Sequence, residues 1–503
     1  MERIRLIATS DIHGEVFPWN YADGRKRNSG LARIRNMIRV MKDENTVVID
    51  NGDSLQGSPL SFYHYTRHPE EISPVTKAMH AIGYDYVNLG NHDFDYGTDA
   101  LFRHLENCSG TCLTANVLYE GTPIGRRYDV RDFDGVKVAF FALTTHRTPD
   151  WEPEEDIRGL TFLNAFDTAK EIVTEIKEKE SADYIVCIYH GSFERDLQTG
   201  EPLMEDTGEN QGYRILKEIP GIDIMISGHQ HLSINTTAFD TTVTQTIHNA
   251  REVAVIDIDY DGIEAWIVPV LEAPDKELME MLSGDEKGCQ EWLDQPLGTC
   301  ENDLQITDEF EDRLHKSQVI TFLNHVQREV TGADLSASSL FIGSAGFRHT
   351  ITMRDLVTTY VFPNTLCVKK IDGRLLKEFL EKCAEFWDID QGKIVISPAF
   401  EIPTPMYFNY EMVDGIEYTI KVSEPVGQRI VSLTKDGRPV RDDDTFTLCI
   451  DNYRAAGGGG FDMLKGIPDI YHGQTSMVEI LATYIMEHQN ICFEEQNNIQ
   501  VIV

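Results

Sequence analysis

Cysteine is scarce in this chain and is spread along it. Nine cysteines occur in 503 residues. Only Cys108 and Cys112 are close neighbours, and no Cys-x-x-Cys pair is present. An odd number of scattered cysteines argues against a disulfide framework and is typical of free thiols in a reducing compartment.

Long apolar runs are absent as well. No stretch approaches the roughly 18 consecutive apolar residues that a membrane-spanning helix needs, so we expect no membrane partner. The first residues lead directly into an apolar strand pattern, and they lack the long apolar region and small-residue cleavage site of a signal peptide. We therefore expect a cytoplasmic protein, or a secreted one if a leader has already been removed.

Positive charge is the third shortage. The chain has 45 Lys and Arg residues against 83 Asp and Glu residues, which gives a formal net charge of −38 at pH 7. This charge repels a phosphate-rich polymer and argues against nucleic-acid binding. A small anionic substrate would need local cations to overcome it.

The length of 503 residues exceeds what one hydrophobic core usually fills, and it predicts two domains. Strand patterns alternate with helical patterns in the first half, which indicates a layered α/β domain. Extra strand-like segments at 119–133 and 236–248 favour a mixed sheet. We place the first domain at 1–280, a connecting helix and linker at 281–309, and the second domain at 310–503.

Polar side chains recur where five predicted strands of the first half end. These strands cover 3–9, 46–50, 84–87, 183–189 and 222–226. The residues at their ends are, in chain order, Asp11, His13, Asp53, Asn91, His92, His190, His229 and His231. A glycine is adjacent in nearly every case, which lets the backbone turn sharply. Open α/β sheets place their chemistry at this carboxyl edge.

Each of these residues alone has an ordinary structural explanation. Asp11 could cap a helix, Asp53 could form an Asx-turn, and His190 could be a hydrogen-bonded loop histidine. Together they indicate a metal centre. Imidazole, carboxylate and amide ligands without a thiolate suit Mn, Zn, Fe, Co or Ni. Because the ligands outnumber the needs of one ion, we expect two divalent ions that share one bridging carboxylate.

The five blocks resemble those of the binuclear metallophosphoesterases. Their order is Asp-x-His, Gly-Asp, Gly-Asn-His-Asp-Phe-Asp, His and Gly-His-x-His. More narrowly, nearly the whole chain is similar to the two-domain 5′-nucleotidases. This resemblance implies an α/β fold, a four-layer α/β/β/α sandwich, followed by an α+β C-terminal substrate-binding domain.

The resemblance also implies a role for each residue of the first domain. The first metal would be held by Asp11, His13 and His231, the second by Asn91, His190 and His229, and Asp53 would bridge the two. His92 would be a catalytic residue that faces the phosphate, and Asp95 would be hydrogen-bonded behind it.

The second half contains two stretches with anion-binding or base-stacking character. One is Gly-Ser-Ala-Gly-Phe-Arg at 343–348, followed by an aromatic segment, and the other is the glycine-rich segment after Tyr453. From the residues alone, tight turns with core aromatics explain them equally well. The resemblance implies that the substrate is bound by Arg313, Arg348, Phe362 and Tyr453.

Two positions depart from the family pattern. The family has an Asp in the glycine-rich loop that holds the ribose hydroxyls, and here that position is Gly459. The Asn expected at the start of the Arg348 block is Gly343. The phosphate end of the site therefore matches the family, whereas the sugar end does not.

The resemblance implies a hydrolase of nucleotide catabolism that cleaves phosphate esters by a metal-bridging hydroxide. Nucleoside 5′-monophosphates, converted to nucleoside and phosphate, are our first expectation. A 2′,3′-cyclic-nucleotide phosphodiesterase with 3′-nucleotidase activity is the alternative, because the ribose contacts are altered. A non-catalytic metal-binding protein is the third hypothesis. The presence of His92 and of all seven predicted metal ligands argues against it.

Overall fold

The computed structural model describes residues 3–150, 152–203, 207–362, 364–402, 404–473, 475–494 and 496–503. The chain divides into two compact units, Met1–Cys289 and Gln290–Val503. This division lies inside the segment 281–309 that we expected to connect two domains. Helix α8 (Ser283–Leu293) lies in this segment, and helix α7 (Lys276–Met281) ends at its first residue.

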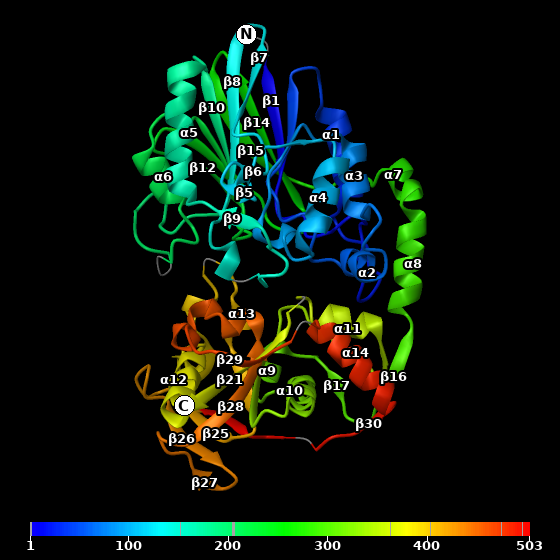
Figure 1. Cartoon of the computed structure of the whole chain (residues 1–503), viewed down its shortest axis with the longest axis vertical. Helices are drawn as coiled ribbons and strands as arrows, with labels where there is room; N and C mark the ends of the chain where they lie inside the picture. Colours follow the sequence, from blue (N-terminus) through cyan, green and yellow to red (C-terminus); the bar gives the residue numbers. More distant parts are fainter. Residues whose placement is uncertain are drawn as a thin grey trace. The chain divides into compact units, whose positions relative to one another are not determined.

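The first unit is built on two six-stranded sheets (Figure 1). The first sheet has the order β15 (Gly262–Pro269), β14 (Glu252–Asp259), β1 (Ile4–Thr9), β2 (Thr46–Asp50), β3 (Tyr86–Val87) and β4 (Thr111–Cys112). The second has the order β12 (Ile234–Ala238), β13 (Thr241–Gln245), β11 (Ile224–Ser227), β10 (Tyr184–His190), β8 (Val136–Thr144) and β7 (Asp129–Phe133). Both sheets are mixed, as the sequence predicts, because parallel central strands are flanked by antiparallel ones.

Alternation along the strands builds the layers. On β10, Val186 and Ile188 belong to the core between the two sheets. Ile185, Cys187 and Tyr189 point to the opposite face and pack with α5 (Ala165–Lys179) and α6 (Gly212–Glu218). Figure 1 shows α1 (Leu31–Met41), α3 (Pro74–Ile82) and α4 (Gly97–Asn107) beside the first sheet. The first unit is therefore a four-layer α/β/β/α sandwich.

Local signals explain where the helices begin and end. The hydroxyl of Ser73 accepts a hydrogen bond from the backbone of Thr76 at 3.1 Å, Pro74 takes the first position, and Gly83 ends α3 in a left-handed conformation. Helix α2 (Pro59–Arg67) is missing from the sequence-based prediction. Its polar and aromatic residues lack a regular apolar stripe, although Ser58 caps it in the same way.

The second unit is also a mixed α/β structure. Its largest sheet has the order β24 (Glu411–Asp414), β18 (Leu335–Ser339), β28 (Thr445–Asp451), β21 (Leu366–Asp372) and β29 (Asp469–His472). A second sheet has the order β27 (Arg438–Pro439), β26 (Ile430–Lys435), β25 (Glu417–Lys421) and β31 (Ile499–Ile502). Its helices are α9 (Glu309–Leu314), α10 (Gln318–Thr331), α11 (Met353–Thr359), α12 (Gly373–Ala384), α13 (Asn452–Ala455) and α14 (Met477–His488).

Short strands complete both units. They are β5 (Val117–Tyr119), β6 (Thr122–Pro123), β9 (Leu160–Phe162), β16 (Pro296–Cys300), β17 (Leu304–Gln305), β19 (Gly346–Phe347), β20 (Thr350–Thr352), β22 (Trp387–Asp390), β23 (Lys393–Ile396) and β30 (Asn490–Ile491). All nine cysteines are free thiols. Among the residues that the structure describes, no helix is long and apolar enough to cross a membrane.

Candidate metal centre

The loops that follow the strands hold their polar residues in an unusual backbone conformation. Asp11, His13, Asp53, His229 and His231 all have positive φ angles, between 51° and 73°. Such angles are uncommon outside glycine and are concentrated at functional sites, where the surrounding structure enforces them. Five of the seven predicted ligands are therefore held by strained turns at the carboxyl edge of the two sheets.

Two glycines allow the loops after β2 and β3 to touch. A Cβ atom at Gly90 would lie 2.1 Å from Oδ1 of Asp53, and one at Gly52 would lie 2.2 Å from the backbone nitrogen of Gly90. Neither position has room for a side chain, so the glycines bring the Asp53 loop against the Asn91 loop.

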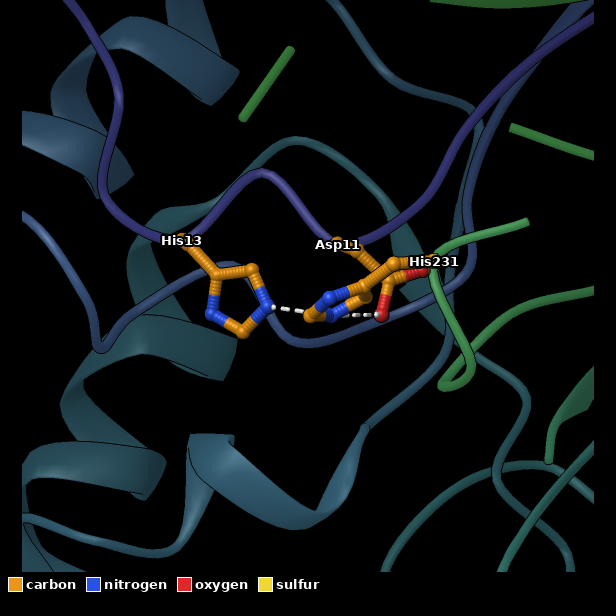
Figure 2. Close-up of side chains that lie close together, drawn as sticks. All are labelled: Asp11, His13 and His231. Carbon is orange, nitrogen blue, oxygen red and sulfur yellow. Dashed lines mark hydrogen bonds and ion pairs between the residues drawn. The ribbon is translucent and has the colours of Figure 1, made fainter. Parts of the chain in front are cut away.

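The first group of predicted ligands is formed by Asp11, His13 and His231, whose ligand atoms lie within 4.8 Å of one another. Figure 2 shows the His231 ring between the other two side chains. Its Nε2 atom lies 3.0 Å from Nε2 of His13 and 3.4 Å from Oδ1 of Asp11. The Nδ1 atom of His13 contacts the backbone oxygen of Gln56 at 3.1 Å, which fixes the ring with Nε2 toward the group.

The second group is formed by Asp53, His190 and His229, again with ligand atoms within 4.8 Å of one another. Nε2 of His190 lies 3.2 Å from Oδ2 of Asp53. On the other side of its ring, Nδ1 lies 2.7 Å from the backbone oxygen of Asn51, so the buried ring is oriented by the loop after β2.

Asp53 adjoins both groups. Its Oδ2 atom lies 3.2 Å from Nε2 of His190 and 4.0 Å from Nε2 of His13. Burial raises the pKa of this carboxyl, but His190, His92 and His13 together hold it well below its ordinary value. The Asp53 side chain is therefore an ionised carboxylate at the junction of the two groups, where the sequence predicts a bridge.

Asn91 supplies an independent indication of a cation. It opens the short helix η1 (Asn91–Asp93), and its Oδ1 atom is buried without a hydrogen-bond donor among the described residues. Buried amide oxygens are nearly always satisfied, so this orphan oxygen needs an explanation. The next residue along the chain, His92, donates its backbone N–H to Oδ1 of Asp53 at 2.8 Å. A divalent cation is the partner that this donor set fits.

His92 and Asp95 form the predicted pair. Nδ1 of His92 lies 3.1 Å from Oδ2 of Asp95, and the ring centroid lies 5.6 Å from that of His13. Burial lowers the pKa of His92, but the carboxylates of Asp95 and Asp53 outweigh it and raise this pKa to about 10. The structure therefore brings His92 beside the candidate centre, with Asp95 behind it.

Two acidic residues near the centre were not identified from sequence. The carboxylate of Asp93 accepts hydrogen bonds from the backbone nitrogens of Gly90, Asp53, Ser54 and Leu55, at 2.8 to 3.0 Å. It ties the two ligand loops together. Oε1 of Glu209 lies 2.7 Å from Nε2 of His229. Asp93 is part of the recognised motif, so its presence was visible, but its partners about 40 residues away were not.

The four predicted substrate residues lie in the second unit. The guanidinium of Arg348 donates to both carboxylate oxygens of Asp355, at 2.8 and 3.2 Å, and its side chain is 55% exposed. Arg313 is only 1% exposed and donates to Glu309 and to the backbone oxygen of Leu340. An incoming anion can therefore reach Arg348 more directly than Arg313.

The two predicted aromatic contacts have aromatic neighbours of their own. The Phe362 ring meets Phe341 edge-to-face at 5.1 Å, and the Tyr453 ring lies 6.3 Å from Phe408. Gly343 has a φ angle of +77° and donates its backbone N–H to Glu309 at 2.8 Å. The part that Phe362 and Tyr453 play in substrate binding stays a prediction.

The glycine-rich loop is held by a residue that the sequence did not single out. Buried Arg454 donates to Glu411, to Asn409 and to the backbone oxygen of Gly458, at 3.0, 3.2 and 2.6 Å. Gly459 has a φ angle of +69°, and a Cβ atom there would lie 2.0 Å from Oδ1 of Asn409. The family's aspartate is therefore absent where this chain has no space for it.

Comparison with known proteins agrees with this architecture. The calcineurin-like phosphoesterase family matches residues 4–233, and the 5′-nucleotidase C-terminal domain family matches residues 296–466. A 2′,3′-cyclic-nucleotide 2′-phosphodiesterase/3′-nucleotidase of Yersinia enterocolitica is 26% identical over 98% of this chain and 87% of its own length. A 5′-nucleotidase of Vibrio vulnificus is 23% identical over 97% of this chain and 91% of its own length.

A solved structure covers the whole chain. It is a crystal structure, in complex with α-ketoglutarate, of a Staphylococcus aureus protein described provisionally as a 5′-nucleotidase. It is 31% identical, covers 100% of both chains and has a TM-score of 0.95. The chain therefore belongs to the two-domain 5′-nucleotidase family of calcineurin-like phosphoesterases, enzymes that hydrolyse phosphate esters with divalent metal ions.

Proposed function

We propose that this enzyme hydrolyses nucleotides, with nucleoside 5′-monophosphates as its principal substrates and nucleoside and phosphate as products. The observation on which the proposal rests is the meeting of two ligand groups at the Asp53 carboxylate. This carboxylate also accepts a hydrogen bond from the backbone N–H of His92, the residue that follows Asn91 with its orphan Oδ1 atom. These residues supply enough ligand atoms for two divalent ions, and their imidazole, carboxylate and amide groups suit Mn, Zn, Fe, Co or Ni.

Some residues of the site would bind the metal ions, and others orient the residues that bind them. Asp11, His13 and His231 would hold one ion, Asn91, His190 and His229 the other, and Asp53 both. Ions bound there would act as Lewis acids on the phosphoryl oxygens and lower the pKa of a water molecule. Backbone oxygens of Gln56 and Asn51 fix the rings of His13 and His190, so these ligands are oriented before any ion binds.

His92 would act on the transferring phosphoryl group. Asp95 holds its Nδ1 side, so the opposite edge of the ring presents Nε2. The neighbouring carboxylates favour the protonated form of this imidazole. A protonated ring donates a hydrogen bond and offsets negative charge that develops on the phosphoryl oxygens. In the second unit, Arg348, oriented by Asp355, is the residue that we propose for binding an anionic group of the substrate.

A 2′,3′-cyclic-nucleotide phosphodiesterase with 3′-nucleotidase activity is the second candidate. Gly459 leaves the glycine-rich loop without the family's ribose-binding carboxylate, and Asn409 occupies the adjacent space. The Yersinia relative that matches 98% of this chain is named for this activity. A ribose whose hydroxyls are already esterified does not need that carboxylate.

A substrate panel tests both candidates. Purified enzyme would be supplied with Mn²⁺, Co²⁺ or Zn²⁺ and assayed on 5′-AMP, 3′-AMP, 2′,3′-cyclic AMP and glycerol phosphate, with Asp53→Asn as the inactive control. Highest kcat/KM on 5′-AMP supports the first proposal, and highest kcat/KM on the cyclic diester supports the second. A preference for glycerol phosphate would refute both, and no hydrolysis with any metal would favour a non-catalytic protein.

A further inference from the structure

Three metal-ligating side chains converge in the second unit, on strands that hold none of the predicted catalytic residues. They are Cys367 on β21 and Asp469 and His472 on β29, and their ligand atoms lie within 4.8 Å of one another. Sγ of Cys367 lies 3.3 Å from Nδ1 of His472, and the same nitrogen lies 3.2 Å from Oδ2 of Asp469.

The strand pairing brings these residues to one side of the sheet. Cys367 and His472 are direct partners across the antiparallel pair of β21 and β29. Asp469 is three residues from His472, and in a regular strand the two side chains would point to opposite faces. The register shifts between Val368 and Lys369, and this irregularity turns Asp469 toward the other two. Such bulges commonly re-aim a side chain at a functional position.

The arrangement differs from a nucleophile, base and orienting acid. In a catalytic triad, the two ring nitrogens of the histidine face different partners. Here the single atom Nδ1 of His472 meets both the thiol and the carboxylate. The ligand atoms of Cys367, Asp469 and His472 are therefore close enough together to bind one metal ion. A tetrahedral Zn²⁺ with ligands at about 2.0–2.3 Å separates its donors by roughly 3.3–3.8 Å. The S–N separation of 3.3 Å and the N–O separation of 3.2 Å in this chain are close to that range.

We propose that Cys367, His472 and Asp469 form a zinc site that is separate from the catalytic centre. Thiolate, imidazole and carboxylate are the three ligand types that Zn²⁺ takes in proteins. Cys367 is 1% exposed, whereas the side chains of His472 and Asp469 are 50% and 26% exposed. The site is therefore closed on the side of the sheet and open to solvent, where a water molecule completes four ligands.

A neighbouring lysine orients the carboxylate. Nζ of Lys369 lies 2.8 Å from Oδ1 of Asp469 and also donates to the backbone oxygen of Ile467 at 2.6 Å. This contact leaves Oδ2 of Asp469 toward His472, as a ligand that binds through one oxygen requires. Burial and the Asp469 carboxylate raise the pKa of the Cys367 thiol, so binding of the ion releases one proton from sulfur to solvent.

A bound ion would stabilise the position of the edge strand β29. β29 lies at the edge of its sheet, and all four of its residues are exposed. A bond from β29 to Cys367 joins it to β21 through side chains as well as through the backbone. Cys367 is two residues after Thr365, whose backbone N–H donates to the side chain of Asn452 at 2.9 Å, so the site adjoins the segment that begins α13.

Cobalt substitution tests the proposal directly. A thiolate bound to Co²⁺ gives a near-ultraviolet charge-transfer band, and the catalytic ligand set contains no sulfur. Reduced full-length protein titrated with Co²⁺ is expected to show this band, and Zn²⁺ should remove it by competition. Cys367→Ser should abolish the band and lower the bound metal by one ion per chain. Cys449→Ser is the matched control, since this buried cysteine of β28 belongs to no such ligand group among the described residues.

A second variant is needed in case Cys367→Ser does not fold. His472 is half exposed, so His472→Ala is expected to fold, as checked by circular dichroism, and to weaken Zn²⁺ binding at this site by more than about tenfold. The proposal is overturned if the wild-type protein shows no sulfur–cobalt band, or if the band and the metal content of His472→Ala equal those of the wild type.

Discussion

Nε2 of His229 lies 2.7 Å from Oε1 of Glu209. A carboxylate only accepts, so Nε2 carries the proton and Nδ1 carries the lone pair that a metal ion needs. The loop that holds Glu209 is itself anchored, because the hydroxyl of Thr145 donates to the Glu209 backbone oxygen at 2.8 Å. Glu209 is thus a positioning residue for a predicted ligand.

Glu209→Gln is expected to weaken metal binding without unfolding the chain. The amide can present its NH₂ group or its oxygen to His229, but it loses the charge that favours the required tautomer. Loss of such a partner typically costs about 10–100-fold in metal affinity. Competition with a chelator of known affinity measures this loss. Glu201→Gln, an exposed position nearby in the chain, serves as the control, and equal affinities for the two variants would contradict the role of Glu209.

His92→Ala is expected to retain both metals and to lose most turnover. The ring is held by Asp95 and contributes no atom to either ligand group. Removal of one donor to a developing oxyanion typically lowers kcat by about 10²–10³-fold. Elemental analysis and kcat are measured together, with the exposed His80→Ala as a control for loss of an imidazole. A normal rate, or loss of metal, would refute this assignment.

Asp53→Asn is expected to lose metal. The Asp53 carboxylate belongs to the second ligand group, with Oδ2 3.2 Å from Nε2 of His190, and it also lies 4.0 Å from Nε2 of His13 in the first group. An amide in its place supplies one neutral oxygen instead of a shared anion, so both ions lose a ligand charge. Elemental analysis after dialysis should find at least one ion per chain fewer than in the wild type, whereas Asp23→Asn on the surface should match the wild type. Full occupancy with normal activity would rule out the bridge.

The sequence predicts the metal-ligating residues of this site better than the residues that orient them. Apolar runs that end in Gly-linked Asp, Asn and His residues place the ligands at one edge, because strand ends are local features. Asp93, Glu209 and Arg454 act through partners that are distant in sequence, and only the folded chain shows these pairs. Helix α2 was missed for a different reason: its cap is clear, but its apolar spacing is not.

Gly459→Asp, which restores the family's residue, is expected to destabilise this chain. Its Cβ atom would lie 2.0 Å from Oδ1 of Asn409 and 2.3 Å from Nη1 of Arg454, both in buried side chains that bind each other. Overpacking of this kind costs about 1–3 kcal/mol. Gly466→Asp separates backbone strain from this collision, since Gly466 has a φ angle of +73° and a Cβ atom there would meet no other atom within 4 Å.

The double variant Gly459→Asp with Asn409→Gly should recover stability relative to Gly459→Asp alone, because it removes the colliding amide. Urea unfolding compares the three variants with the wild type. If Gly459→Asp lowers the free energy of unfolding by no more than Gly466→Asp does, the collision with Asn409 does not explain the glycine at position 459.

His104 is expected to make the first unit less stable in acid. Burial lowers the pKa of this histidine from 6.5 to about 4, and its Nδ1 atom contacts the hydroxyl of Thr76 at 2.9 Å. As the pH falls below 6.5, His104 becomes protonated in the unfolded chain, whereas in the folded chain it becomes protonated only near pH 4. The free energy of unfolding therefore falls as the pH decreases through this window, by about 3 kcal/mol for this group.

His104→Gln removes the titrating group and keeps a polar partner for Thr76. Urea unfolding of the wild type and the variant, at a series of pH values between neutral and the lower limit of the window, isolates the contribution of His104 as the difference between them. Because the substitution also changes packing at neutral pH, the slope of stability with pH rather than the absolute stability is the relevant quantity. Parallel slopes would show that His104 is protonated in the folded chain as readily as in the unfolded one.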